Sequence, residues 1–111
     1  DNSGAGLAIT LNNVNLDNNN AGASPAIAAP GNGGGLHITG AGDANITGGT
    51  ANGNIAGKEG GGLWNGSGTM TITGTTITSN TAIGDATGGG GLFNNGGIID
   101  VDATTTLSGN I

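Results

Sequence analysis

The chain has no cysteine, one cationic side chain and no long apolar run. Its 111 residues hold 1 Lys+Arg, which is Lys58, against 7 Asp+Glu, so the net charge is −6. Nucleic acid and anionic membranes are bound by clustered Lys or Arg, so both are excluded as partners. No apolar stretch approaches the roughly 20 residues of a spanning helix, so no membrane insertion is expected. A lack of cysteine is compatible with export without disulfides.

Bulky aliphatic residues are also scarce, whereas glycine is abundant, with 27 Gly in 111 residues. Such a composition lies near the low-complexity classes, but those classes have no sequence period. Here "GAGL" ends at Leu7, and "GGGL" ends at Leu36, Leu63 and Leu92, at spacings of 29, 27 and 29. The sequence therefore predicts one domain of four repeats of about 28 residues, with units at 1–32, 33–59, 60–88 and 89–111.

A second pattern repeats independently of the glycines. "ITGGTANGNIA" (46–56) aligns without a gap on "ITGTTITSNTA" (72–82), and "LNNVNLDNNNA" (11–21) and "TTTLSGN" (104–110) fit the same frame. Apolar and polar residues alternate within it, as Met70 and Ile72 do with Thr71 and Thr73, which indicates strands. Repeated Gly and scarce helix formers disfavour helices. The unit length and its Gly/Asn corners favour one coil of a parallel β-helix, so the predicted fold is all-β, with about four coils.

Two columns of the frame have predicted structural roles. Because stacked coils repeat the same corner about 4.8 Å apart, the glycine before each repeat Leu (Gly35, Gly62 and Gly91) is predicted to form a corner with positive φ. The second column is predicted to form a ladder of stacked side-chain amides along the axis, and it consists of Asn19, Asn54, Asn80 and Asn110.

The segments "GGGLWNGSGTMTITGTTITSNTA" (60–82) and "GGGGLFNN" (88–95) resemble the repeats of right-handed parallel β-helix proteins exported by bacteria. These include polymorphic outer-membrane proteins and adhesin-like surface proteins, whose units pair a glycine-rich, aliphatic motif with an Asn-bearing strand. Asn follows the aromatic residue directly here, unlike the aromatic-x-x-Asn element of that family. The resemblance implies a right-handed coil, export and a surface or matrix role, and it implies little about a ligand.

His37, Trp64 and Phe93 each follow a repeat Leu, as Ala8 does in the first unit, and we expect all four to stack in one outward column. An outward aromatic strip could bind sugar rings. The alternative is a stacking ladder that only stabilises the coils, worth about 0.5–1.5 kcal/mol per pair. A metal site at His37 is not expected, because no second His or Cys exists.

Four further sequence patterns bear on function. Asp100 and Asp102 share a strand face and could bind Ca²⁺, although no Ca²⁺-binding nonapeptide occurs; otherwise no cofactor is expected. Enzymatic activity is not expected, because a lyase acting on uronic acids needs Arg or Lys as base, and Lys58 lies beside Glu59. Ice binding requires a regular Thr array, but only one of the four outward pairs in the repeat frame reads Thr-x-Thr; the pairs are Asn15/Asp17, Thr50/Asn52, Thr76/Thr78 and Thr106/Ser108. Asn45 and Asn65 match glycosylation sequons, which chance also produces in a sequence so rich in Asn and Thr.

The expected function is that of an extracellular or cell-surface structural or adhesive module; the alternative is a carbohydrate-binding module that uses the aromatic strip. A proline-bearing loop at 21–32 is predicted to protrude and to make lateral contacts. From Asn110 across a joint to Leu7 there are 8 residues, against 9 and 12 at the equivalent internal positions. We therefore expect copies to stack head to tail, or the chain to be one period of a longer solenoid.

Overall fold

The computed structural model describes residues 5–22, 31–84 and 88–111, and every regular element in them is a β-strand. The protein is therefore all-β, as predicted. The strands are short, which is expected where Gly and Asn corners interrupt the chain every few residues. They are β1 (Ala8–Asn12), β2 (Asn15–Asp17), β3 (Leu36–Ile38), β4 (Asp43–Thr47), β5 (Thr50–Asn52), β6 (Ile55–Ala56), β7 (Leu63–Asn65), β8 (Thr69–Thr73), β9 (Thr76–Thr78), β10 (Thr81–Ala82), β11 (Leu92–Asn94), β12 (Ile98–Val101) and β13 (Thr106–Ser108).

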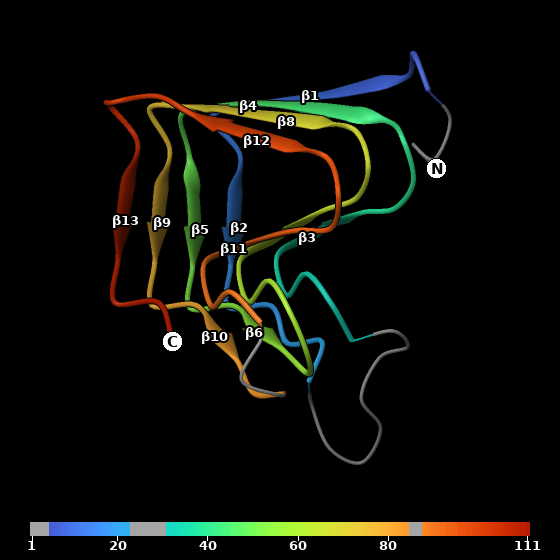
Figure 1. Cartoon of the computed structure of the whole chain (residues 1–111). Coiled ribbons are helices and arrows are strands. Elements are labelled where there is room, and N and C mark those ends of the chain that lie inside the picture. Colours follow the sequence, from blue (N-terminus) through green and yellow to red (C-terminus); the bar gives the residue numbers. More distant parts are fainter. Residues whose placement is uncertain (1–4, 23–30, 85–87) are drawn as a thin grey trace.

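The strands form four sheets, and all the strand pairs are parallel (Figure 1). The sheet orders are β1-β4-β8-β12, β13-β9-β5-β2, β11-β7-β3 and β10-β6. Successive passes of the chain therefore add a strand to the same sheets. We call these passes rungs: rung 1 holds β1 and β2, rung 2 holds β3 to β6, rung 3 holds β7 to β10, and rung 4 holds β11 to β13.

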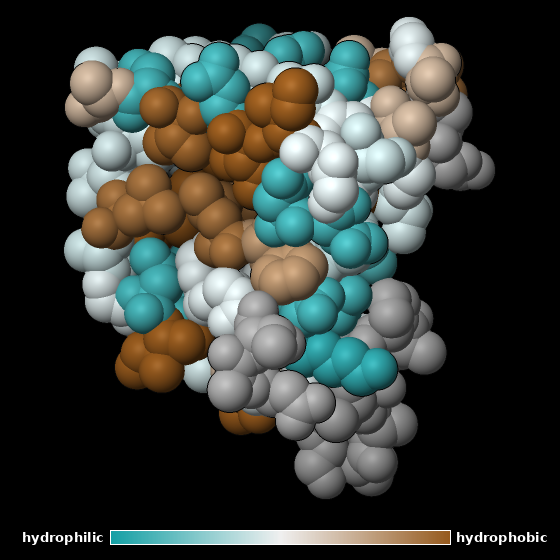
Figure 2. Space-filling model, in the orientation of Figure 1, coloured by the Kyte–Doolittle hydropathy of each residue, from teal (hydrophilic) through white to brown (hydrophobic). Residues whose placement is uncertain are grey.

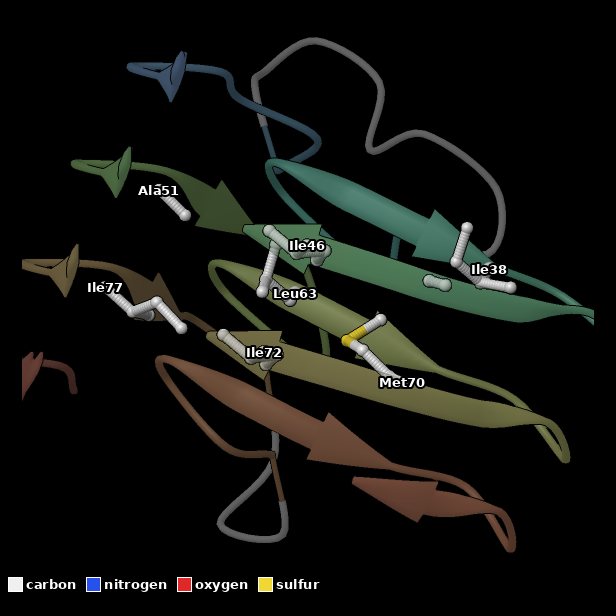
Figure 3. Close-up of a cluster of buried hydrophobic side chains, with 8 residues drawn as sticks. Ile38, Ile46, Ala51, Leu63, Met70, Ile72 and Ile77 are labelled. Carbon is white, nitrogen blue, oxygen red and sulfur yellow. The ribbon is translucent and has the colours of Figure 1, made fainter. Parts of the chain in front are cut away.

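The core lies between the sheets and is built by alternation along the strands. In β8 the side chains of Met70 and Ile72 are fully buried, as is that of Ile77 in β9, whereas Thr73 and Thr76 are exposed. Figure 3 shows these apolar side chains together with those of rung 2 in the space that the strands enclose. The predicted period of two and its inward phase are confirmed.

The repeat frame from 11–21 to 104–110 is also confirmed by the register of the sheets. One column consists of Leu16, Ala51, Ile77 and Leu107, and another of Leu11, Ile46, Ile72 and Val101. Each column places apolar side chains above one another, so the register is fixed by burial: a slip of one residue would turn each strand's apolar set outward.

The predicted place of the first glycine motif is wrong. Ala8 pairs with Asp43, and the Leu7 carbonyl accepts a hydrogen bond from the Asp43 amide, so neither Leu7 nor Ala8 lies in the column of Leu36 and His37. The register that forms instead stacks Ile9 on Ala44 and Leu11 on Ile46. Among the described residues, the sheet of β3, β7 and β11 therefore has no strand from rung 1, and the joint length counted to Leu7 has no structural equivalent.

The predicted reason for the corner glycines is wrong too. Gly35, Gly62 and Gly91 do not have positive φ. Within two of the triplets positive φ occurs at the first glycine instead, Gly33 and Gly60. It also occurs at the residue before each ladder asparagine, namely at Asn18, Gly53, Ser79 and Gly109. This corner turns the chain so that the next side chain, the asparagine, enters the interior, and only two of its four members are glycines.

The loop predicted to protrude at 21–32 falls mainly on residues 23–30, which lie outside the described residues.

Candidate functional site

The asparagine column lies inside the rungs and forms a continuous chain of amides. Asn54 and Asn80 are fully buried. The Asn54 amide Nδ2 donates to Asn80 Oδ1 at 2.9 Å, and Asn80 Nδ2 donates to Asn110 Oδ1 at 2.9 Å. Asn19 Nδ2 donates to Asn54 Oδ1 at 3.0 Å, so one chain of side-chain hydrogen bonds crosses all four rungs.

Each step of this ladder consists of the same four hydrogen bonds. Between Asn80 and Asn110, both the backbone N–H and Nδ2 of Asn80 donate to Asn110 Oδ1, at 3.0 and 2.9 Å. Asn110 Nδ2 donates to the Ile77 carbonyl at 2.9 Å, and the Ile111 N–H donates to the Asn80 carbonyl at 2.8 Å. The same set joins Asn54 to Asn80 and Asn19 to Asn54. Because the side-chain amides of the buried ladder asparagines are all hydrogen-bonded to neighbouring rungs, the ladder specifies which residues stack.

The third glycine of each triplet leaves room for this ladder. A Cβ added at Gly35 would lie 3.0 Å from Asn54 Nδ2, one at Gly62 would lie 3.0 Å from Asn80 Nδ2, and one at Gly91 would lie 2.9 Å from Asn110 Nδ2. Gly62 would also bring its Cβ to 2.6 Å from the Gly91 carbonyl oxygen of the next rung. The glycines are therefore required by close approach to the amides and to the neighbouring backbone.

A second pair of stacked amides was not predicted. Asn65 is fully buried, and its Nδ2 donates to Asn94 Oδ1 at 2.9 Å and to the Gly68 carbonyl at 3.0 Å. Asn94 repeats the local bond with its own Nδ2 on the Gly97 carbonyl, at 2.7 Å. The signal in the sequence is the Asn that follows the aromatic residue in both units.

Because Asn65 is buried, its sequon is inaccessible in the folded chain, whereas Asn45 is exposed on β4.

His37, Trp64 and Phe93 lie in one column, as their register requires. The Trp64 and Phe93 rings are stacked at a centroid distance of 6.3 Å, and the His37 ring meets Trp64 edge-on at 4.3 Å. Trp64 is only 6% exposed, and its Nε1 donates to Glu59 Oε2 at 3.1 Å. Burial lowers the pKa of His37 below its usual value. The covered Trp64 face favours the stacking ladder over a sugar platform.

Of the two acidic residues predicted as Ca²⁺ ligands, Asp102 is hydrogen-bonded within the chain, and Asp100 is exposed on β12. Asp102 accepts hydrogen bonds from the hydroxyls of Thr104 and Thr105 and from the Gly74 N–H, and these bonds lower the pKa of Asp102 to about 2. No group of three or more His, Cys, Asp or Glu side chains gathers within 5–22, 31–84 and 88–111.

Two hydroxyls of the outward pairs, on β9 and β5, are hydrogen-bonded to side chains of the preceding rung. The Thr78 hydroxyl donates to Asn52 Oδ1 at 2.9 Å, and the Thr50 hydroxyl donates to Asp17 Oδ1 at 2.7 Å. The residues stacked in one column with Thr76 are Asn15, Thr50 and Thr106. Because this column is mixed, it is not the regular Thr array that ice binding requires.

Both ends of the stack partly expose residues of the inward columns. We call the end at rung 1 the head face, with Ile9, Leu11 and Leu16, and the end at rung 4 the tail face, with Ile99, Val101 and Leu107. Leu107 is 46% exposed, whereas Ile77, which precedes it in the same column, is fully buried. Apolar surface gathers on the side of the molecule where the strands of rung 4 lie nearest the viewer (Figures 1 and 2). At each end the outer strands β1, β2, β12 and β13 are also the edges of their sheets.

No protein-family model matches the chain, and no curated protein or solved structure matches it at a significant level. In the part of the chain that the structure describes, no helix has the length and apolar character needed to cross a membrane.

Proposed function

We propose that the chain is a right-handed parallel β-helix of about four coils that acts as a structural and adhesive module outside the cell. Right-handedness is supported by the nearly invariant hand of connections between parallel strands. A role at the cell surface is supported by the low charge, with 7% Asp, Glu, Lys and Arg, and by the repeat resemblance. The proposed role is not enzymatic and uses no cofactor.

The mechanism that we propose is cohesion through the two end faces. The single observation that carries it is the partial exposure of inward apolar columns at both ends, beside strand edges whose backbone groups can pair further. A further rung, supplied by a second copy or by a longer chain, would cover both features. The contact joins unlike faces, so it propagates into a fibre. Four rungs near 4.8 Å give an axial rise of about 19 Å per 111 residues.

Charge does not oppose this contact. Continuing the register of the columns places Asp17 of one copy over Ser108 of the next, and Thr10 over Asp100. Among the described residues, no two acidic side chains therefore share a column across the junction.

The test blocks one face at a time. Leu107→Lys places a charge on the tail face, whereas Thr106→Lys places the same charge outward on the same strand. In sedimentation and negative-stain microscopy, we expect fibres from the wild type and from Thr106→Lys, and none from Leu107→Lys. Because Leu107→Lys keeps its head face, a small fraction of it should also shorten wild-type fibres. A wild-type chain that stays monomeric at high concentration contradicts the proposal, as does equal assembly of both variants.

The alternative is a carbohydrate-binding module that uses the aromatic column. The observation that favours it is the partial exposure of Phe93, whose ring ends the stack at rung 4. If this is the function, glycan-array binding by the folded chain is lost in Phe93→Ala and retained in Thr106→Lys. Absence of glycan binding by the wild type would contradict it.

A further inference from the structure

The asparagine ladder has a direction, and that direction leaves different groups at its two ends. In every step Oδ1 accepts from the rung before it, and Nδ2 donates to the carbonyl three residues before the preceding asparagine. For Asn54 and Asn80, Oδ1 accepts from the head side, the backbone N–H and one Nδ2 hydrogen donate to the tail side, and the other Nδ2 hydrogen donates to a carbonyl on the head side. An inverted copy could not repeat this set.

At the tail face the last described step of the ladder leaves donors and acceptors that no described residue uses. Asn110 uses Oδ1 and one Nδ2 hydrogen internally, toward Asn80 and Ile77. Among the described residues, nothing accepts the Asn110 backbone N–H or donates to the Asn110 or Leu107 carbonyl. In the preceding step the equivalent groups of Asn80 and Ile77 are hydrogen-bonded to Asn110 and Ile111.

At the head face the complementary half is present. Asn19 donates its N–H and Nδ2 to Asn54 Oδ1, but none of the described residues donates to Asn19 Oδ1. The Asn20 N–H likewise has no acceptor in the described part of the chain, whereas the equivalent Ile55 N–H donates to the Asn19 carbonyl. Asn19 and Asn20 thus offer the acceptor and the donor that Asn110 and Ile111 use in the last internal step.

We propose that a second copy of this chain docks on the tail face by a fifth step of the asparagine ladder. The Asn110 N–H and Nδ2 donate to Asn19 Oδ1 of the next copy. In return, that Asn19 Nδ2 donates to the Leu107 carbonyl, and that Asn20 N–H donates to the Asn110 carbonyl. This inference rests on the proposed head-to-tail assembly and names its register: the same step stacks Leu16 of the next copy on Leu107, and Leu11 on Val101.

The ladder therefore selects one partner and one alignment, whereas the apolar faces alone would tolerate several. A one-residue slip would place the positive-φ corner residue Asn18 opposite Asn110 and leave the amides of both copies unpaired in a closing interface. Leaving polar groups unpaired on burial is costly.

The test is Asn19→Ala, with Asn12→Ala as the matched control. Both asparagines are exposed in rung 1, and within one copy Asn54 Oδ1 still accepts the residue 19 N–H after the change. Fibre formation is measured as the critical concentration in a pelleting assay, with circular dichroism showing that both variants fold. Losing two or more net hydrogen bonds per junction should raise the critical concentration about tenfold or more for Asn19→Ala. Asn12→Ala should change it less than about twofold, because its side chain lies outside the ladder.

A second readout needs no variant. Hydrogen exchange should show the backbone amides of Asn110 and Asn20 protected in fibres and unprotected in the monomer. Wild-type fibres in which these amides exchange freely, or in which Asn19→Ala assembles like Asn12→Ala, overturn the ladder step while leaving head-to-tail assembly intact. A wild-type chain that forms no fibres overturns both.

Discussion

At the scale of the residue, the glycine triplets show two separate uses of glycine. Positive φ occurs at the first glycine of two triplets, Gly33 and Gly60, and at other corners, including the one before the ladder, where Ser79 also adopts it. Gly62 has ordinary φ and is excluded from bearing a side chain by the Asn80 amide and the Gly91 carbonyl. The sequence shows that glycine recurs, but it does not show which reason applies, because the atoms that would collide lie on other rungs.

The two reasons predict different costs for alanine. Gly62→Ala should lower the free energy of unfolding by about 3 kcal/mol or more, since the clash involves backbone that cannot move aside. Gly74→Ala, at φ 60 with its nearest atom at 3.5 Å, should cost only about 1–2 kcal/mol of backbone strain. Urea denaturation of the two variants checks the order. A larger loss for Gly74→Ala would contradict the steric reason given for Gly62.

Asp102 supplies a prediction on pH. Its pKa is lowered from 3.8 to about 2 by the hydrogen bonds from Thr104, Gly74 and Thr105. A carboxylate with a depressed pKa stabilises the fold above its unfolded pKa, and this contribution is lost as pH falls through about 4 toward 2. Melting temperatures between pH 5 and 2 should therefore fall more steeply for the wild type than for Asp102→Asn. Parallel profiles for the two would show that the Asp102 bonds do not matter for stability.

At the scale of the element, alternation and the asparagine column were sufficient to align strands from different rungs. The frame that aligns 46–56 with 72–82 predicts the observed pairing of Ala51 with Ile77. Both side chains are buried, and burial of the apolar face fixes the register. The "GAGL" of the first unit was misleading. A glycine motif has little side-chain surface, so the larger burial of Ile9 and Leu11 decides the pairing of β1. The Asn65–Asn94 pair was not predicted, because both side chains also donate to loop carbonyls, and the sequence does not show which carbonyls lie close to them.

The inward and outward faces of β9 give a prediction for this scale. Ile77 is fully buried, whereas the adjacent Thr76 is exposed. Ile77→Asp buries an unpaired charge and should cost several kcal/mol, enough to unfold a small domain. Thr76→Asp should cost about 1 kcal/mol or less. Thermal melts followed by circular dichroism measure both, and equal losses would contradict the assigned faces.

At the scale of the whole molecule, the rungs are joined unequally. Within the described residues, two strand pairs and one isolated bridge join rung 1 to rung 2, four strand pairs join rung 2 to rung 3, and three join rung 3 to rung 4. Rung 1 has fewer pairs because neither the sheet of β3, β7 and β11 nor that of β6 and β10 receives a strand from it. Stability is therefore greatest in the middle of the stack, where neighbouring rungs support both sides.

This inequality has a mechanical consequence. The bonds between rungs run along the stack, so a pull along that axis applies the same tension to every step in series. The step between rungs 1 and 2 has the fewest strand pairs, and it should part first, at a lower force than the other steps. In single-molecule stretching with handles at both ends of the chain, the first extension should therefore release the length of β1, β2 and the segment up to β3. A first event that releases β11 to β13 instead would place the weakest step at the opposite end.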